Sequence, residues 1–407
     1  MASSIFLASP ILLVILFHLL LENNPTSCFA TNPTEKPPPD LRLPLTHVDL
    51  AKSFPKNQFT PSSMSETNAA EITSPTQASN DLYVTKLAIG TPPVIFSAVV
   101  DTGSDLIWTK CDSSSRFYDS SKSKSFFKSE ESCDSFGCTQ EYADGESIKV
   151  SMGGEKVIIG GVSSNITFAC GTPNDKKSFN KYNGVVGMGR GKLSLVSQLN
   201  INVFSYCLAS RSHKSEQSIL LTGSNTKIAM TNVQTTPLLK QGNKSYYYIA
   251  LEGISVGKTK LGVSTSDFAI KTDGTGGMII DSGSTFTYLE KDIINMIENE
   301  LMKQTKVNMS KDDNPPYQGL NRYFNSPSDV NWDIPKLVFH FSGANWEMPR
   351  ENYIYEKNGK SYLAFIDNDN DPEKMSIFGN MQQQNMMVLY DLVKNSLSFK
   401  TEKCSLL

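Results

Sequence analysis

The chain has 407 residues, which is enough for two or three domain-sized units with a sizeable core. Hydrophobic residues make up 39% of it and charged residues 19%, and the formal net charge is −3. This composition is typical of a soluble globular protein and excludes the basic surface that nucleic-acid binding needs. Only four histidines are present, and no cysteine pair is spaced with them as zinc ligands are, so we expect no metal site.

The amino-terminal segment is mostly apolar from Ile5 to Leu21 and holds no acidic residue there. Cys28 and Ala30 put small residues at the two positions that a signal peptidase reads, which predicts a secretory signal peptide over residues 1–30. A membrane anchor is the alternative, but the apolar run is short for a span and polar residues follow it. We therefore expect a secreted, extracellular protein, with the vacuole as the alternative destination.

Residues 31–78 differ in composition from the rest of the chain. They include three consecutive prolines at 37–39, and a stretch rich in Ser, Thr, Asn and Gln runs from Thr60 to Asn80. Stretches of this kind bury too little apolar surface to order themselves. We expect both of them to be poorly ordered.

A duplicated motif follows. In the stretch Phe96 to Trp108, apolar residues run into Asp101, and Thr-Gly-Ser comes next; in the stretch Gly277 to Leu289, apolar residues run into Asp281, and Ser-Gly-Ser comes next. A single Asp-Thr/Ser-Gly turn is common, because Asp and Gly are ordinary turn residues. Two copies, each behind an apolar run, predict a duplicated unit that brings two carboxylates together.

Two carboxylates held close together cannot both ionise easily, so they share a proton. One then acts as general base on a water molecule, while the protonated one polarises a peptide carbonyl. The glycines of the two copies let the backbone turn tightly, and the neighbouring hydroxyls are short donors that hold the carboxylates in register. The supporting residues predicted on this reasoning are Thr102, Gly103, Ser104, Ser282, Gly283 and Ser284.

Local patterns predict the other elements. Strands are expected at 83–89, 94–100, 246–251, 332–341 and 397–399, a short helix at 192–199, and a hairpin at 141–150 with Asp144 and Gly145 at its tip. Apolar residues at 293, 294, 297 and 301 predict an amphipathic helix over 291–304. Arg190 stands between glycines as in a phosphate-binding loop, but neither Walker nor Rossmann spacing follows it.

Six cysteines remain once Cys28 leaves with the signal peptide, which fits up to three disulfides formed in an oxidising compartment. The candidates are Cys111, Cys133, Cys138, Cys170, Cys207 and Cys404. Three Asn-x-Ser/Thr sequons make Asn165, Asn243 and Asn308 candidates for glycosylation.

A set of further motifs stands in order along the chain: Leu87–Pro93, Asp101–Trp108, Tyr142–Gly145, Asn183–Gly191, Phe204–Leu208, Asp281–Ser284 and Ile377–Gln383. Together they resemble the pepsin-type aspartic proteases, and most closely the plant nepenthesin-like group, over residues 83–404. The resemblance implies a mostly β, bilobal, pepsin-like acid protease fold, in which two related β-rich lobes enclose the active-site cleft. It implies an amino-terminal lobe at 79–238 and a carboxy-terminal lobe at 239–407.

The same resemblance assigns further roles. Residues 31–78 stand where the family has a propeptide, although the basic helical stretch that usually follows is missing, so a simple linker is the alternative. The hairpin becomes a flap with Tyr142, Asp144 and Gly145 facing the substrate; an ordinary surface hairpin is the alternative. Trp108 either supports the flap tyrosine or is a plain core aromatic.

The cysteines are interpreted through the family as well. The resemblance pairs Cys207 with Cys404, which ties the last strand to the first lobe. A second pair that clips the carboxy-terminal lobe in the family is absent here, and Tyr323 and Tyr362 stand at its two positions. We expect the loss of one disulfide rather than damage to the fold.

The predicted function is that of a secreted, monomeric aspartic endopeptidase that hydrolyses protein or peptide substrates at acidic pH, without a metal or an organic cofactor. A catalytically silent binding protein or inhibitor on the same fold is the alternative, because a fold does not determine function. Both Asp motifs and Tyr142 are intact, which favours the enzyme. A Ser/His/Asp hydrolase is disfavoured because the chain has no Gly-x-Ser-x-Gly motif.

Overall fold

The computed structural model describes residues 38–49, 81–111, 117–129, 139–141, 147–172, 183–212, 217–229, 231–325, 333–369 and 371–404. The range Pro38–Leu407 forms one compact unit. The predicted signal peptide and the sites Cys133, Cys138, Tyr142, Asp144 and Gly145 lie outside the described residues.

Strands dominate both halves of the unit. Those of the amino-terminal half are β1 (Arg42–Asp49), β2 (Asp81–Ile89), β3 (Val94–Asp101), β4 (Ile107–Lys110), β5 (Thr139–Glu141), β6 (Ser147–Ile159), β7 (Val162–Thr172), β8 (Gly184–Gly187), β9 (Val203–Cys207), β10 (Ser218–Thr222) and β11 (Gln234–Leu239). Those of the carboxy-terminal half are β12 (Tyr248–Ile249), β13 (Leu251–Val256), β14 (Thr259–Lys260), β15 (Met278–Ile280), β16 (Thr287–Leu289), β17 (Met309–Lys311), β18 (Arg322–Phe324), β19 (Leu337–Phe341), β20 (Ala344–Met348), β21 (Ile354–Lys357), β22 (Lys360–Leu363), β23 (Phe365–Asp367), β24 (Ser376–Phe378), β25 (Met386–Asp391) and β26 (Ser396–Thr401).

In the ranges that the structure describes, helices are few and short apart from one. They are α2 (Leu195–Gln198), α3 (Lys291–Thr305) and the 3-10 helices η1 (Ser120–Lys122), η3 (Gly223–Ala229), η4 (Thr265–Phe268), η5 (Arg350–Asn352) and η6 (Asn380–Gln383). The prediction of an amphipathic helix at 291–304 is confirmed by α3, which buries Ile293, Ile294, Ile297 and Leu301. The helix predicted at 192–199 is shorter than expected, because the Ser194 side chain caps it by accepting from the Ser197 N–H.

The two lobes repeat one strand arrangement. In the first lobe β8 lies between β3 and β4, parallel to β3 and antiparallel to β4. In the second lobe β24 lies in the same way between β15 and β16, parallel to the first and antiparallel to the second. The duplicated unit inferred from the motif is therefore present in the strand pairing, and the mostly β, bilobal fold is confirmed.

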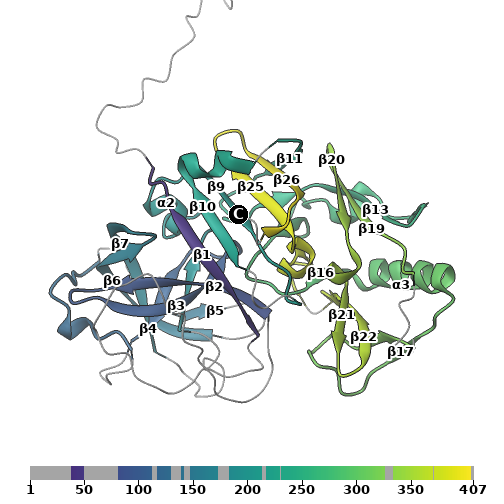
Figure 1. The fold of residues 1–407 in the computed structure, drawn as a ribbon, viewed down its shortest axis with the longest axis horizontal. Helices are drawn as coiled ribbons and strands as arrows, with labels where there is room; N and C mark the ends of the chain where they lie inside the picture. Colours follow the sequence, from purple (N-terminus) through teal and green to yellow (C-terminus); the bar gives the residue numbers. More distant parts are fainter. Residues whose placement is uncertain are drawn as a thin grey trace, which may run out of the picture. The chain divides into compact units, whose positions relative to one another are not determined.

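A central sheet joins the two lobes. Its strand order is β1–β10–β9–β25–β26–β11. Figure 1 shows teal strands β9 and β10 and yellow strands β25 and β26 between the blue strands of the first lobe and the green strands of the second. The Cys207–Cys404 disulfide, as predicted, ties the carboxy-terminal end to β9, and a Cys111–Cys170 disulfide joins the end of β4 to β7.

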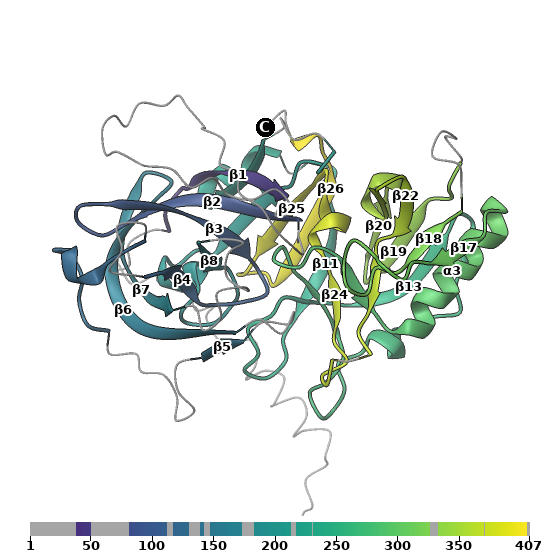
Figure 2. The same cartoon turned by 90° about the horizontal axis from the view of Figure 1, so that it is seen from below.

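Strand β1 belongs to the segment for which a propeptide or a linker was predicted. Its first half, 42–45, pairs with β10, and its second half, 46–49, pairs with β2, so that it bridges the central sheet and the first lobe (Figure 2). Leu41, Leu43 and Leu45 are at most 2% exposed. The segment thus contributes a packed strand to the fold.

One predicted strand is interrupted. The residues 246–251 were expected to form a single strand, but β12 and β13 belong to different sheets, with Ala250 between them. The Ala250 carbonyl accepts a hydrogen bond from the Ser342 N–H at 2.9 Å, beside β19, so the chain changes partners at this residue. Periodicity alone does not reveal such a change, because both pieces are buried.

Tyr323 and Tyr362, for which the resemblance implies the positions of an absent cysteine pair, stand directly opposite each other on β18 and β22. Their ring centroids are 5.8 Å apart. The Tyr362 hydroxyl donates to Asp312 at 2.5 Å, and Lys360 pairs with the same carboxylate at 2.7 Å. Packed rings and a charged cluster therefore join β18 and β22 at these positions.

We expect that β1 contributes to the stability of the folded unit. Replacement of buried Leu43 by Ala should lower the free energy of unfolding by roughly 2–5 kcal/mol, because it removes apolar contacts from the hydrophobic core. The exposed Thr46→Ala on the same strand is the matched control and should cost under about 1 kcal/mol. Denaturant unfolding measures both, and equal small effects would show that β1 is only loosely attached.

Candidate active site

The two aspartates of the duplicated motif meet at the junction of the lobes. Asp101 is the last residue of β3, and Asp281 follows β15 directly. They are 8% and 6% exposed. A Cβ placed on Gly103 would lie 2.7 Å from the Asp281 carboxyl carbon, and one on Gly283 would lie 2.1 Å from Asp101 Oδ1. The close approach of the turns thus leaves no room for a side chain at either glycine.

This corrects the reason given for the two glycines. Neither takes a positive φ, so backbone freedom is not what requires them. Each glycine instead lets the opposite carboxylate come into contact with its own turn.

Each carboxylate accepts two hydrogen bonds from its own turn. One oxygen accepts from the glycine N–H two residues on, and the other accepts from the serine hydroxyl three residues on. The bonds are Gly103 N to Asp101 Oδ1 at 2.9 Å, Gly283 N to Asp281 Oδ1 at 2.8 Å, Ser284 Oγ to Asp281 Oδ2 at 2.6 Å, and Ser104 Oγ to Asp101 Oδ2. Both side chains are therefore oriented before any substrate arrives.

Thr102 and Ser282 bind each other's backbone rather than the carboxylates, which differs from the expected role. Ser282 N–H donates to Thr102 Oγ1 at 2.9 Å, and Thr102 N–H donates to Ser282 Oγ at 3.2 Å. Their hydroxyls then donate across the junction to the carbonyls of Ile280 at 3.4 Å and Val100 at 2.8 Å. The two turns are thus locked together by a reciprocal pair of bridges.

The electrostatics of the pair follow from this burial. Burial raises the pKa of Asp101 well above its ordinary value of 3.8, and the negative charge of Asp281 raises it further. The hydrogen bonds from Ser104 and Gly103 act in the opposite direction on the same pKa. The net effect of these groups is a pKa of Asp101 that lies above that of a free aspartate.

Gln383 forms the floor beneath Asp281 and was given no role from the sequence. Its Nε2 donates to the carbonyls of Asp281 at 3.1 Å and Phe378 at 2.7 Å, and its Oε1 accepts from the Tyr206 hydroxyl. Gln383 is fully buried. The one signal in the sequence is the run of glutamines at 382–384 beside apolar residues, because a buried amide needs partners on every side.

The glycine-rich loop at 187–191 encloses a carboxylate of the protein itself. Gly191 N–H donates to Asp105 Oδ1 at 2.8 Å. A Cβ on Gly189 would lie 2.4 Å from the same oxygen. The phosphate-loop appearance of this segment therefore reflects the packing around Asp105.

The structure describes only the two strands of the hairpin that was predicted to be a flap. β5 pairs with β6 as an antiparallel hairpin, with Glu141 opposite Ser147. Trp108 is fully buried beside Val99 and Ile148, as the core reading predicts. Its predicted support of Tyr142 involves a residue outside the described ranges.

We predict that the reciprocal bridge is needed to hold the dyad. Thr102→Val keeps the side-chain shape but removes the acceptor of the buried Ser282 N–H, so the free energy of unfolding should fall by roughly 1–3 kcal/mol. Thr102→Ser keeps the hydroxyl and is the matched control. Denaturant unfolding and peptide hydrolysis of both variants check this, and a Val variant that equals the Ser variant would contradict it.

Comparison with known proteins places this geometry in a family. A family model described as "Xylanase inhibitor N-terminal" matches residues 83–224, and one described as "Xylanase inhibitor C-terminal" matches residues 246–401. Among solved structures, the one titled "Crystal structure of edgp" covers 90% of this chain and 96% of that chain with a TM-score of 0.63. At 18% identity, this likeness shows the fold alone.

Two aspartic proteinases are more similar to this chain in sequence than that structure is. Aspartic proteinase nepenthesin-1 of Nepenthes gracilis is 38% identical over 79% of this chain and 78% of its own length. Aspartic proteinase nepenthesin-2 of the same plant is 33% identical over 91% of each chain. With both halves matched and relatives at this identity, the chain belongs to the pepsin-type plant aspartic proteases and is an aspartic-type endopeptidase similar to the nepenthesins.

Proposed function

We propose that Asp101 and Asp281 share one proton and activate a water molecule that attacks the carbonyl of a peptide bond at acidic pH. The observation that carries the proposal is the contact of two buried carboxylates across twin turns, each carboxylate fixed by hydrogen bonds from its own turn. A shared proton is the arrangement established for aspartic proteases as a class.

The proposed reaction needs one ionised and one protonated carboxyl. The ionised one takes a proton from water, and the protonated one donates a hydrogen bond to the peptide carbonyl. The tetrahedral intermediate then collapses as the leaving nitrogen receives a proton, and no bond forms between enzyme and substrate. Neither role is assigned to one aspartate, because the pair titrates as a unit.

The hairpin of β5 and β6 is proposed as the lid of this site, with Tyr142, Asp144 and Gly145 at the substrate. Its antiparallel arms support the proposal. A lid that covers the bound peptide would exclude bulk water and order the substrate.

A secreted, monomeric enzyme is proposed, extracellular or vacuolar, which loses a signal peptide at residues 1–30. Two disulfides among the described residues fit an oxidising compartment. The sequon residues Asn165, Asn243 and Asn308 are all exposed, so each is accessible for glycosylation. Among the described residues, no helix is both long and apolar enough to cross a membrane.

A catalytically silent binder or inhibitor is the second candidate. The names of the matching family models favour it, since they describe xylanase inhibitors. Against it stands the complete set of hydrogen bonds around both aspartates, which a protein without catalysis does not need. The enzyme is therefore the better-supported candidate.

Hydrolysis of a denatured protein substrate should be measured from about pH 3 to about pH 7. We expect it to be strongest at the acidic end of this range. Pepstatin, an inhibitor of aspartic proteases, should abolish it by occupying the site. Asp101→Asn should abolish it because an amide cannot take part in the ionised–protonated pair. Asp313→Asn, at an exposed aspartate outside the site, is the matched control and should retain activity. A folded, processed protein inactive at every pH would favour the binding protein.

The raised pKa of Asp101 also predicts how stability depends on pH. Above the unfolded pKa of about 3.9, the unfolded chain has released the proton that the folded pair still holds. Stability therefore falls as pH rises through the interval up to the raised folded pKa. Asp101→Asn lacks this loss, so its free energy of unfolding should decline less towards neutral pH. Denaturant unfolding at a series of pH values checks this, and parallel profiles would contradict it.

A further inference from the structure

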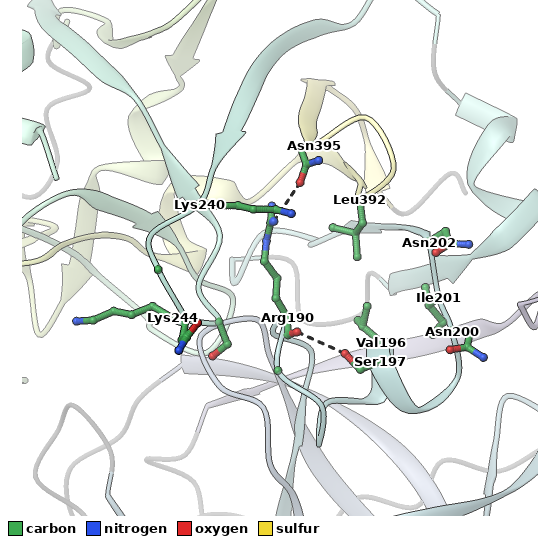
Figure 3. A pocket seen from close by; sticks show the side chains of 14 residues that line it. Arg190, Val196, Ser197, Asn200, Ile201, Asn202, Lys240, Lys244, Leu392 and Asn395 are labelled. Atoms are coloured by element: carbon green, nitrogen blue, oxygen red, sulfur yellow. Dashed lines mark hydrogen bonds between the residues drawn. The ribbon is translucent and has the colours of Figure 1, made fainter. Parts of the chain in front are cut away.

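A concave site lies where three segments of the chain meet, and neither aspartate of the dyad is in its lining. The cavity has a volume of about 540 Å³. Its walls come from the loop and α2 region at 190–202, the connection at 240–245 and the β25–β26 turn at 392–395 (Figure 3). It is large enough for a small organic molecule or an inorganic ion with its water.

Arg190 provides the most informative group in this cavity. Its Nη1 donates to Asn395 Oδ1 at 3.1 Å, whereas Nε and Nη2 are buried without a hydrogen-bond partner among the described residues. The guanidinium lies over the ring of Tyr247, with Cζ 5.1 Å from the ring centroid, and the Tyr247 hydroxyl is fixed by the Met188 carbonyl. The guanidinium is thus held in place by Asn395 and Tyr247, and the burial of its two other nitrogens leaves its positive charge without a carboxylate partner in the described part of the chain.

The charges around the cavity have one sign. Lys240 also lines it and forms no ion pair with the described residues, while Lys244 is paired with Glu373 at 2.6 Å. The lining contains no aspartate or glutamate. In Figure 3 the charged ends of Arg190 and Lys240 both point towards Asn395. Two positive charges face the same cavity without a carboxylate to compensate them.

We propose that this cavity binds a small oxyanion that carries at least two negative charges, such as sulfate, phosphate or an organic polycarboxylate. Arg190 and Lys240 supply two positive charges that would attract such an anion into the cavity. Asn200 and Asn202 in the lining offer further amide donors.

A bound anion would connect segments that are distant in the chain. It would tie the loop behind the first Asp turn to the connection between the lobes and to the last β-turn. Because only the folded chain brings these segments together, the anion should stabilise the folded state in proportion to its occupancy.

The test measures thermal unfolding of the deglycosylated enzyme near neutral pH in sodium chloride, sulfate, phosphate or citrate at matched ionic strength. The deglycosylation matters because the sequon residue Asn243 lines the cavity. Sulfate should raise the melting temperature by about 2–4 °C over chloride, and calorimetric titration with sulfate should give one saturable site. The phosphate and citrate arms distinguish an inorganic ligand from a polycarboxylate.

Three variants locate the effect. Lys240→Gln should reduce the response to sulfate, and Lys258→Gln, at an exposed lysine outside the lining, should leave it unchanged. Asn395→Asp supplies an internal carboxylate at the Arg190 guanidinium, and Asp tolerates the left-handed backbone at this position. That variant should be more stable than the wild type in chloride and should lose the response to sulfate.

The Asn395→Asp variant separates anion binding from a purely structural role of Arg190, because it keeps the arginine. A wild-type enzyme that responds equally to sulfate and chloride would overturn the proposal. A full sulfate response in both Asn395→Asp and Lys240→Gln would do so as well.

Discussion

The contact between two buried carboxylates is the constraint on which the rest of the structure depends. Two ionised carboxylates in contact repel each other, and burial removes the water that would screen this repulsion. The fold meets this cost locally, since glycine and serine of each turn bind the turn's own aspartate. A long-range contribution comes from Thr102 and Ser282, whose hydrogen bonds join the two turns across 180 residues of sequence.

The central sheet also supports the contact between Asp101 and Asp281. Its strands come from both lobes, and a disulfide ties the carboxy-terminal end to β9. Tyr206 on β9 and Tyr390 on β25 place their hydroxyls 3.0 Å apart, and Tyr206 reaches Gln383 beneath the second turn. A displacement of one lobe would therefore break buried polar contacts as well as apolar ones, which keeps the carboxylates in register.

Strand β1 bears on how such an enzyme is activated. It precedes the mature region implied by the family resemblance, yet it fills an edge of the central sheet and contacts the first lobe. Its removal would uncover the edge of β10 and take the buried side chains of Leu43 and Leu45 out of the core. Cleavage between β1 and β2 would leave the strand held by hydrogen bonds and packing, so processing of the chain need not remove it from the fold.

Much of the fold and of the dyad could be predicted because their signals are local. The apolar run into Asp101 and its repeat at Asp281 are visible as short motifs, and α3 follows from a 3.6-residue period. The bridge between Thr102 and Ser282 could not be predicted, because each hydroxyl finds its partner on the other turn. The break between β12 and β13 at Ala250 could not be predicted for a similar reason, because it depends on which distant strands pair with the two segments.

The duplication also explains why neither Asp motif reveals the role of Gln383. In the first lobe the Asp101 carbonyl accepts from the backbone N–H of Met188 at 2.7 Å. In the second lobe the Asp281 carbonyl accepts instead from the Gln383 side chain at 3.1 Å. One lobe thus satisfies a buried carbonyl with the main chain, and the other satisfies it with an amide from a short helix. Equivalent turns therefore place different demands on side chains, and a motif shared by both copies cannot show which residues meet them.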